Sequence, residues 1–400
     1  MFVDRVLSGM RPTGALHLGH YQGVLKNWLD LQNEYECYFF VADWHALTTH
    51  YETPNVLEEN VWDMLIDWLA AGVDPSQAVL FIQSKVPEHA ELHLLLSMIT
   101  PLGWLERVPS FKDQQEKLTQ RDLSTYGFLG YPLLQASDIL IYRANLVPVG
   151  EDQVPHIEFT REIARRFNHI YGKDVNYEKK AKEAIKKLGS KRGKLYQKML
   201  NRYQEQGDLE GLAEGRALLE ETSNLSIGDR ERLFGYLEGG GKVILSEPKA
   251  LLTKAAKMPG VDGLKMSKSY DNTISLRDDS KTIEKKIRKM PTDPARVRRT
   301  DPGEPENCPV WQYHKIYSDP DTQNWVDVGC RSAGIGCLDC KQPIVDGIRK
   351  ELAPIRERAL KYEEDPAALR NIMADGCDRA RKIVSDTMRD VKDAIGTSYS

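Results

Sequence analysis

Two kinds of segment alternate along the first 150 residues of the chain. Short apolar runs, rich in aromatic or β-branched side chains, predict strands at residues 5–10, 35–42, 78–83 and, followed by a loop, 139–149. Apolar side chains at helical spacing predict helices at residues 20–32, 55–71 and 88–99. This alternation predicts an α/β fold: a Rossmann-like parallel sheet with helices on both faces, whose ligands bind at the carboxyl ends of the strands.

Length and composition indicate a globular protein of more than one domain. The chain has 400 residues, of which 41% are hydrophobic and 28% charged. No apolar run reaches the roughly 18 residues that a membrane helix needs, and the N-terminus leads into a strand-like segment, so we expect a cytoplasmic protein without a membrane partner. The net charge of −4 does not indicate a polyanionic partner, although a local cluster of positive charge could still bind one.

The character of the sequence changes after Asn168. Residues 173–202 carry eleven Lys or Arg against three acidic residues, the sequence then turns acidic, and it reaches a run of three glycines at 239–241. We interpret residues 173–242 as a mostly helical insertion. Its basic half has two readings, contact with nucleic-acid phosphates or a solvated helix face, and the absence of interleaved aromatic residues slightly favours the second.

From about Leu276 the sequence is helical in pattern to its end. Helices are predicted at residues 281–289, 342–362 and 366–395, the last with Pro366 in its first turn, where a missing N–H costs nothing. We therefore predict a C-terminal all-helical domain. The expected division is a catalytic domain at 1–172, the insertion at 173–242, completion of the catalytic domain at 243–275, and the helical domain at 276–400.

The run His17-Leu18-Gly19-His20 lies where a strand gives way to a helix. Free N–H groups and the helix dipole favour phosphate at such a place, and both imidazoles can donate hydrogen bonds to phosphate oxygens. Gly19 has no side chain, so a nucleoside can lie against the backbone. On its own, the run is more typical of a loop with two exposed imidazoles.

A second run, Lys265-Met266-Ser267-Lys268-Ser269, begins 245 positions after His20 and follows a flexible Pro-Gly-containing approach at 259–263. Its lysines supply mobile positive charge that can close on phosphates as negative charge develops on a leaving group. Alone, such a run is typical of a charged surface loop.

Taken together, in this order and with an α/β pattern between them, the two runs resemble the paired nucleotide signature of class I aminoacyl-tRNA synthetases. The resemblance implies ATP-dependent activation of an amino acid, with ATP and Mg²⁺ as cofactors and the metal held mainly by phosphates and water. It implies catalytic roles for His17, His20, Lys112, Lys265, Ser267 and Lys268. It implies ATP contacts for Met10, Arg11, Pro12, Thr13, Gly19, His20, Gly150, Asp152, Lys265, Met266 and Lys268.

Five further segments, residues 8–14, 42–48, 81–84, 131–140 and 147–153, resemble the bacterial tryptophanyl-tRNA synthetases. This resemblance implies tryptophan and tRNA(Trp) as partners, a homodimer, and a helical C-terminal domain that reads the anticodon. The implied tryptophan-binding residues are Leu7, Gly9, Tyr131, Gln135, Asp138, Val147, Val149 and Gln153.

Asp138 lies in an otherwise apolar helical stretch, where a carboxylate is costly without a partner. Its chemistry leaves two roughly equal readings, a bond to a nearby backbone N–H or a bond to a ligand. In the family the matching Asp accepts the indole N–H, a donor-only group. Gln135 departs from the pattern, because the family often has Met there, packed on the indole.

Three alternatives remain. Tyrosyl-tRNA synthetases share the fold and an Asp near the aromatic tip, although the runs at 44–48 and 149–153 favour tryptophan. A non-catalytic tRNA-binding or regulatory paralogue would keep the fold, but both ATP motifs are intact. Other nucleotidylyltransferases with His-x-Gly-His are usually short and lack a helical C-terminal domain.

Four of the six cysteines, Cys308, Cys330, Cys337 and Cys340, form the pattern C-x21-C-x6-C-x2-C. Four thiolates suit Zn²⁺ or an iron–sulfur cluster, and four free thiols are the third reading. A similar spacing occurs in a subset of tryptophanyl-tRNA synthetases with a [4Fe-4S] cluster, which makes the cluster the favoured expectation and zinc the alternative. The expected role is structural.

Overall fold

A five-stranded sheet organises the fold of the computed structural model, which describes residues 4–108, 125–173, 176–206, 208–252 and 258–399. The strands lie in the order β3-β2-β1-β4-β5, and the printed pairings β2–β3, β1–β4 and β4–β5 are all parallel. They are β1 Arg5–Met10, β2 Glu36–Val41, β3 Ala78–Ile82, β4 Leu146–Val149 and β5 Lys249–Leu252. The predicted α/β class with a parallel sheet is therefore confirmed.

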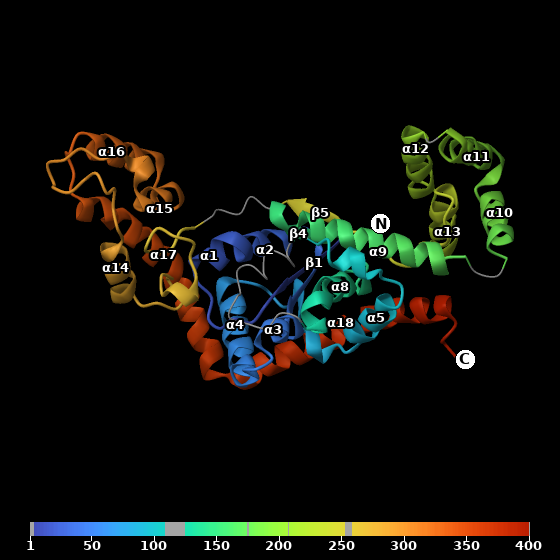
Figure 1. Ribbon diagram of the computed structural model, residues 1–400, viewed down its shortest axis with the longest axis horizontal. Coiled ribbons are helices and arrows are strands. Elements are labelled where there is room, and N and C mark those ends of the chain that lie inside the picture. The colour runs from blue at the N-terminus through green and yellow to red at the C-terminus, as the bar shows by residue number, and fades with distance from the viewer. Residues whose placement is uncertain (1–3, 109–124, 174–175, 207, 253–257, 400) are drawn as a thin grey trace. The chain divides into compact units, whose positions relative to one another are not determined.

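The central strands are almost uniformly apolar because helices bury both of their faces. All five residues of β3 are buried, as are Cys37 to Val41 of β2. These two strands pair in register from Cys37 opposite Ala78 to Val41 opposite Ile82. Helices connect the strands, as in Figure 1: α3 Asp43–His50, α4 Leu57–Ala71, α5 Glu88–Ser97, α6 Leu102–Leu105, α8 Tyr126–Ile141 and α9 Val154–Tyr171.

The strand predicted at 139–149 is wrong over its first half. Residues up to Ile141 belong to α8, Arg143 turns the chain with a left-handed φ of 51°, and β4 starts only at Leu146. An apolar run inside a buried helix has no periodicity that separates it from a buried strand, which explains the error. Strand β5 was not anticipated, because its four residues are too few to form a recognisable pattern.

The helix after β1 is continuous but irregular. It consists of α1 Leu18–His20, a π-helical turn η1 at Tyr21–Leu25, and α2 Lys26–Leu31. Single π-turns inside helices occur frequently at functional sites. The predicted strand-to-helix position of residues 17–20 is confirmed, since His17 is the residue at the helix cap.

Residues 176–237 form four helices with a core of their own: α10 Tyr177–Lys187, α11 Gly189–Gln206, α12 Leu209–Glu220 and α13 Ile227–Leu237. Ten buried side chains between Ala184 and Leu237 make up this core. The module leaves and rejoins the rest at one place, because Lys242 N donates to Gly172 O at 2.8 Å. In Figure 1 these green helices gather beyond the end of α9.

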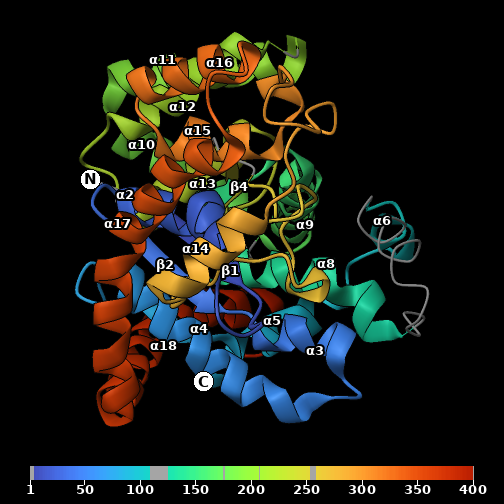
Figure 2. The same ribbon diagram turned by 90° about the vertical axis from the view of Figure 1, so that its left-hand side faces the viewer.

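The remainder after residue 276 is helical, as predicted. Its helices, orange to red in Figure 2, are α14 Ser280–Lys289, α15 Pro309–Tyr317, α16 Pro320–Arg331, α17 Cys337–Glu364 and α18 Pro366–Ile395. The bounds of α18 match the prediction, whereas α17 begins five residues early, at Cys337. Within the described ranges, none of the helices combines the length and apolarity needed to span a bilayer.

Two compact units divide the chain. One contains Met1–Ser8, Gln83–Leu252 and Cys377–Ser400, and the other contains Gly9–Ile82 and Thr253–Gly376. The His-x-Gly-His run, the Lys-Met-Ser-Lys-Ser run and the four clustered cysteines all lie in the second unit. Most of the residues expected to bind tryptophan lie in the first.

Candidate active site

His17 and His20 cap their own helix. Gly19 N donates to His17 Nδ1 at 3.1 Å, and His17 N donates to His20 Nδ1 at 3.4 Å. The two rings stack with centroids 3.8 Å apart. Because each Nδ1 accepts a hydrogen bond, each neutral ring carries its proton on Nε2. The cap therefore fixes the tautomer in which Nε2–H is the available donor.

Electrostatics keep both imidazoles uncharged. Burial, together with the positive charge of Lys268, lowers the pKa of His17 to about 4. Burial, the neighbouring His17 and Lys268 lower the pKa of His20 to about 3. At neutral pH both side chains are thus hydrogen-bond donors rather than cations, and the positive charge at this place comes from lysine.

The two motifs meet in space. Lys268 Nζ donates to the backbone oxygen of Thr13, and it lies 3.4 Å from where a Cβ on Gly14 would stand. A Cβ on Gly19 would lie 3.6 Å from Met266 Sδ. Gly14 has a φ of +85°, so glycine suits this turn both in backbone conformation and in space. Segments 245 positions apart in sequence therefore form one basic, glycine-lined site.

A short antiparallel pairing holds the segments together. Leu18 N donates to Ile274 O at 2.9 Å and Leu276 N donates to Leu16 O at 3.1 Å, with His17 opposite Ser275. These bonds join the residues at the start of the first motif to those that follow the second. The distance between the motifs is consequently set by backbone hydrogen bonds.

A buried ion pair between Asp67 and Arg277 contacts this antiparallel pairing. Asp67, with no exposed surface, accepts the N–H of Leu16 and lies 3.0 Å from Arg277 Nε. Arg277 also contacts Asp63 at 2.8 Å and Glu363 at 2.7 Å. Burial raises the pKa of Asp67 to about 6 despite the opposing effect of Arg277. Sequence reasoning missed Asp67, although a carboxylate inside the apolar helix α4 was a usable signal.

Asn272 shapes the lysine-bearing loop. Its side chain, 2% exposed, accepts from Ser267 N at 2.7 Å and donates to Lys265 O at 3.0 Å and to Asp262 Oδ1 at 2.8 Å. One buried amide thus bridges the loop from both sides. Lys265 and Lys268 remain exposed. Sequence analysis did not single out Asn272, because an Asn in a loop is ordinary.

The expected tryptophan residues divide between α8 and the strands. Tyr131, Gln135 and Asp138 share one face of α8, because they stand at i, i+4 and i+7. Leu7, Val147 and Val149 are buried on the paired strands β1 and β4. A Cβ on Gly9 would lie 2.4 Å from the Phe40 ring, so the chain has no room for a side chain there.

Asp138 has strong partners. It is 1% exposed, accepts from Gln83 Nε2 at 2.8 and 3.0 Å, and lies 2.6 Å from His89 Nδ1. His89 Nε2 in turn lies 2.9 Å from Tyr142 Oη. These partners are side chains, a possibility beyond the backbone N–H and the ligand that the sequence left open. Gln83 and His89 were not predicted, since they come from a different part of the chain.

The structure describes most of the remaining expected residues. Gln153 Nε2 donates to Asp152 Oδ2 at 3.0 Å, and a Cβ on Gly150 would lie 2.8 Å from Asp152 Oδ1. Arg11 and Thr13 are exposed and Pro12 is buried, while Met10 is half-buried. Lys112 lies outside the described residues.

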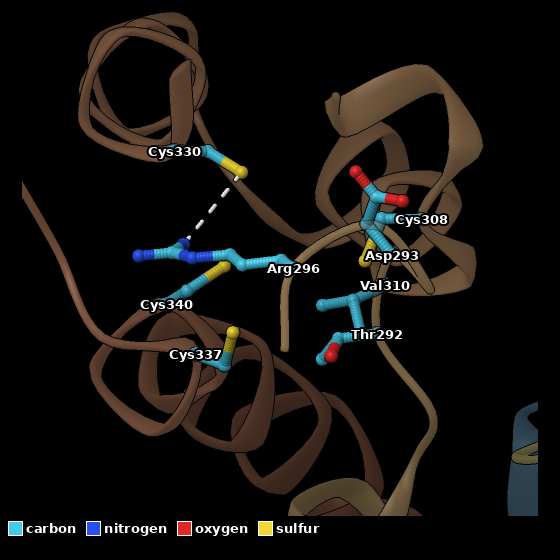
Figure 3. Close-up of a pocket in the computed structure, with 8 residues that line it drawn as sticks. All are labelled: Thr292, Asp293, Arg296, Cys308, Val310, Cys330, Cys337 and Cys340. Carbon is cyan, nitrogen blue, oxygen red and sulfur yellow. Dashed lines mark hydrogen bonds between the residues drawn. The ribbon is translucent and has the colours of Figure 1, made fainter. Parts of the chain in front are cut away.

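Three elements bring the four cysteines around one pocket (Figure 3). Cys308 precedes α15, Cys330 lies in the last turn of α16, and Cys337 and Cys340 lie in the first turn of α17. Arg296 extends among them, with Nη1 3.8 Å from Cys330 Sγ. Burial and the other three cysteines raise the pKa of the Cys340 thiol to about 12. As they stand, the described residues contain no group of three or more potential ligands arranged to hold a metal ion.

Comparison with known proteins identifies the family of the chain. The sequence profile of the family described as tRNA synthetases class I (W and Y) matches residues 4–199 and 225–353. The chain belongs to this family. It is therefore an enzyme, an aminoacyl-tRNA synthetase, and the non-catalytic alternative is set aside.

The chain is also similar over its whole length to curated tryptophan–tRNA ligases. The chain is 69% identical over 400 residues, the whole of both chains, to the tryptophan–tRNA ligase of Ralstonia nicotianae. It is 43% identical to the tryptophan–tRNA ligase of Thermotoga maritima over 99% of this chain and 100% of that one. A Campylobacter jejuni tryptophanyl-tRNA synthetase crystallised with ADP and tryptophan superposes with a TM-score of 0.73 at 29% identity, covering 98% of this chain and 99% of that one.

The histidine pair gives a direct spectroscopic prediction. Because the pKa values of His17 and His20 lie near 4 and 3, their imidazole NMR signals should keep neutral-form shifts as the pH falls from 8 to about 5. Assignment uses His17→Asn and His20→Asn; midpoints near 6.5 for either residue would contradict the capped, neutral arrangement.

Proposed function

We infer that this enzyme activates tryptophan with ATP and transfers it to tRNA(Trp), using the residues described above. The carboxylate of tryptophan attacks the α-phosphorus of ATP, giving tryptophanyl-adenylate and pyrophosphate. The terminal ribose hydroxyl of the tRNA then attacks the mixed anhydride. One observation carries this proposal: His17, His20 and Lys268 lie together around glycine-lined backbone, in a chain that matches tryptophan–tRNA ligases from end to end.

In this reaction the chain positions groups rather than supplying a covalent intermediate. The Nε2–H groups of His17 and His20 would donate to phosphate oxygens, and Lys265, Ser267 and Lys268 would stabilise charge on the departing pyrophosphate. Lys112 would reach the phosphates as well. Mg²⁺ would be held by the phosphates and water and would neutralise their charge. The remaining expected ATP contacts are Met10 to Thr13, Gly19, Gly150, Asp152 and Met266.

On the amino-acid side, Asp138 would accept the indole N–H while Gln83 and His89 hold its carboxylate in place. Leu7, Gly9, Val147 and Val149 would wall the flat ring. Tyr131 and Gln153 would bond the α-amino group, and Gln135 would take the place of the family's methionine. Because tyrosyl-tRNA synthetases also have an Asp near the aromatic tip, the selection of tryptophan over tyrosine would depend on the size and shape of the pocket more than on the acceptor itself.

The wider organisation follows the family. We propose that residues 1–172 and 243–275 form the catalytic domain, that residues 276–400 read the anticodon, and that two chains act as a homodimer in the cytoplasm. The helices α14–α18 support the helical part of this division.

Tryptophan-dependent ATP–pyrophosphate exchange tests the assignment of substrate and of Asp138. Tryptophan should support exchange and tyrosine should not. Asp138→Asn should raise the KM for tryptophan roughly tenfold or more and leave the KM for ATP unchanged, because a donor amide then faces the indole N–H. Gln135→Met is the matched control on the same helix face and should change the tryptophan KM little. A lower unfolding midpoint with an unaltered tryptophan KM would make Asp138 a structural residue only.

For the cysteines we propose a structural [4Fe-4S] cluster, with Zn²⁺ as the alternative occupant. The chemistry of the lining supports this proposal, since four cysteine side chains from three elements line one pocket. Cationic Arg296 lies among them, and Lys341 follows directly after Cys340, which suits an anionic thiolate centre. The cluster would tie α15, α16 and α17 together and would take no part in adenylate formation.

Anaerobic purification tests the centre. The protein should be brown and contain about four iron atoms per chain, and Cys330→Ala should abolish the colour. Cys37→Ala with Cys377→Ala is the matched control, because these two buried cysteines lie elsewhere and their loss should leave iron content unchanged. Colourless protein with one zinc per chain, or with no metal, would contradict the iron–sulfur assignment.

A further inference from the structure

The first two helices of the insertion concentrate positive charge in an otherwise acidic chain. Residues 177–204 contain ten Lys or Arg and two Glu, a net of +8, so the rest of the chain sums to −12 against the total of −4. From Gly189 to Gln204, along α11, there is no acidic residue at all. A surface this one-sided needs a reason, because like charges on one helix face repel each other.

Helical spacing places these charges on one face of each helix. On α10, Lys179, Lys182 and Lys186 stand at i, i+3 and i+7, opposite the buried Tyr177, Ala181 and Ala184. On α11, Lys191, Lys194 and Lys198 repeat the same spacing, opposite the buried Tyr196 and Leu200. We call these six exposed lysines the basic face.

The insertion does not use this charge internally. Other basic residues of α10 and α11 are paired, Lys187 with Asp229 and Arg202 with Asp208 and Glu214. Among the residues that the structure describes, no ion pair or hydrogen bond is recorded for the side chains of the basic face. Their side chains are exposed, as are those of Glu178 and Glu183 beside them on α10. Further exposed acidic residues, Glu210, Glu214 and Glu220, lie on α12.

We propose that the basic face binds the phosphate backbone of RNA and that this RNA is the tRNA substrate, a step that rests on the proposed function. The lysine row on α11 spans seven residues, or about 10 Å. Adjacent phosphates on one strand of a B-form DNA duplex are about 3.4 Å apart along the axis. A row of about 10 Å is therefore long enough to contact up to three successive phosphates of a nucleic-acid strand. A polyanion with regularly spaced charges is therefore a good match to a row of regularly spaced lysines.

Chemistry around the row argues against a membrane. A helix that lies in a bilayer interface needs a broad apolar face beside its basic one. On the described parts of α10 and α11, Leu195, 42% exposed, is the large apolar side chain at the surface. Ser190, Gln197 and Asn201, which flank the lysine row on the side away from Leu195, are polar and exposed, as expected for a surface that contacts sugars and phosphates.

The module also makes the proposal testable without unfolding the enzyme. Its core consists of side chains from α10 to α13, and no residue of the basic face belongs to it. Substitutions on the basic face should therefore leave the helices and the adenylate chemistry intact.

The test compares the full-length enzyme with K191Q/K194Q/K198Q and with the charge-preserving K191R/K194R/K198R. Measured with an unmodified tRNA(Trp) transcript, the Gln variant should bind about tenfold more weakly near 0.1 M salt. The slope of log affinity against log salt should become shallower by about 2 to 3, because three phosphate contacts are lost. The Arg variant should bind like the unsubstituted enzyme. Tryptophan-dependent ATP–pyrophosphate exchange, which needs no tRNA, should be unchanged in both variants.

If the Gln variant has an unchanged tRNA affinity and salt slope, the proposal is overturned. The same holds if this variant keeps its tRNA affinity but loses binding to phosphatidylglycerol vesicles or to poly-L-glutamate, because the basic face would then bind a membrane or an acidic protein. Weaker binding with an unchanged slope would likewise contradict phosphate contact. Absence of tryptophan-dependent exchange in the unsubstituted enzyme would be a failure of the proposed function, and it is measured independently of the basic face.

Discussion

The antiparallel pairing of residues 16–18 with 274–276 is the constraint on which the proposed nucleotide site depends. Two backbone hydrogen bonds fix the relative positions of a histidine-capped helix and a lysine-bearing loop. Asp67 anchors this pairing from beneath, accepting Leu16 N and pairing with Arg277. A buried carboxylate is stable only with such partners, and losing one partner of a buried ion pair typically costs about 3–5 kcal/mol. The site's geometry is thus built into the core of its unit.

Charge is distributed unevenly over the site. The histidines are held neutral by burial and by Lys268, with Nδ1 occupied by the helix cap. Lys268 is kept close to Thr13 and Gly14, while Lys265 is exposed at the loop surface. In the proposed reaction, the neutral donors that are fixed in place would orient a triphosphate, and the cations on the loop would stabilise charge as it develops. This proposed division of tasks would require both motifs.

The sequence predicts those parts of the structure whose pattern is complete within a short segment, and not those that depend on contacts between distant residues. Periodicity located β1 to β3 and the whole of α18, because those patterns are complete within a few turns or one strand. It misassigned residues 139–141, where an apolar helix imitates a strand, and it began α17 at 342 although Gly336 and Cys337 start it. The two nucleotide motifs were recognisable as residues, whereas their contact depends on long-range pairing.

The residues that hold the candidate site residues in place could not be predicted from local sequence patterns. Asn272, Gln83 and His89 act through contacts that span from a few to more than fifty positions, and no pattern in the sequence announces them. Asp67 could be recognised only as a charge in an apolar helix, because the sequence does not reveal its partners Leu16 and Arg277. The insertion shows the opposite case: its charge was plain in the sequence, but only the helix packing shows that the lysines form rows on the solvent side.

A double-mutant cycle on Asp67 and Arg277 tests the central claim most directly. The measured quantity is kcat/KM for ATP in tryptophan-dependent pyrophosphate exchange, for Asp67→Asn, Arg277→Met and the double variant. If the ion pair holds the paired segments in register, each single change should lower kcat/KM strongly and the double variant should be no worse than the poorer single one, a coupling of about 1–3 kcal/mol. Additive losses, or single variants with unaltered kcat/KM, would contradict the account.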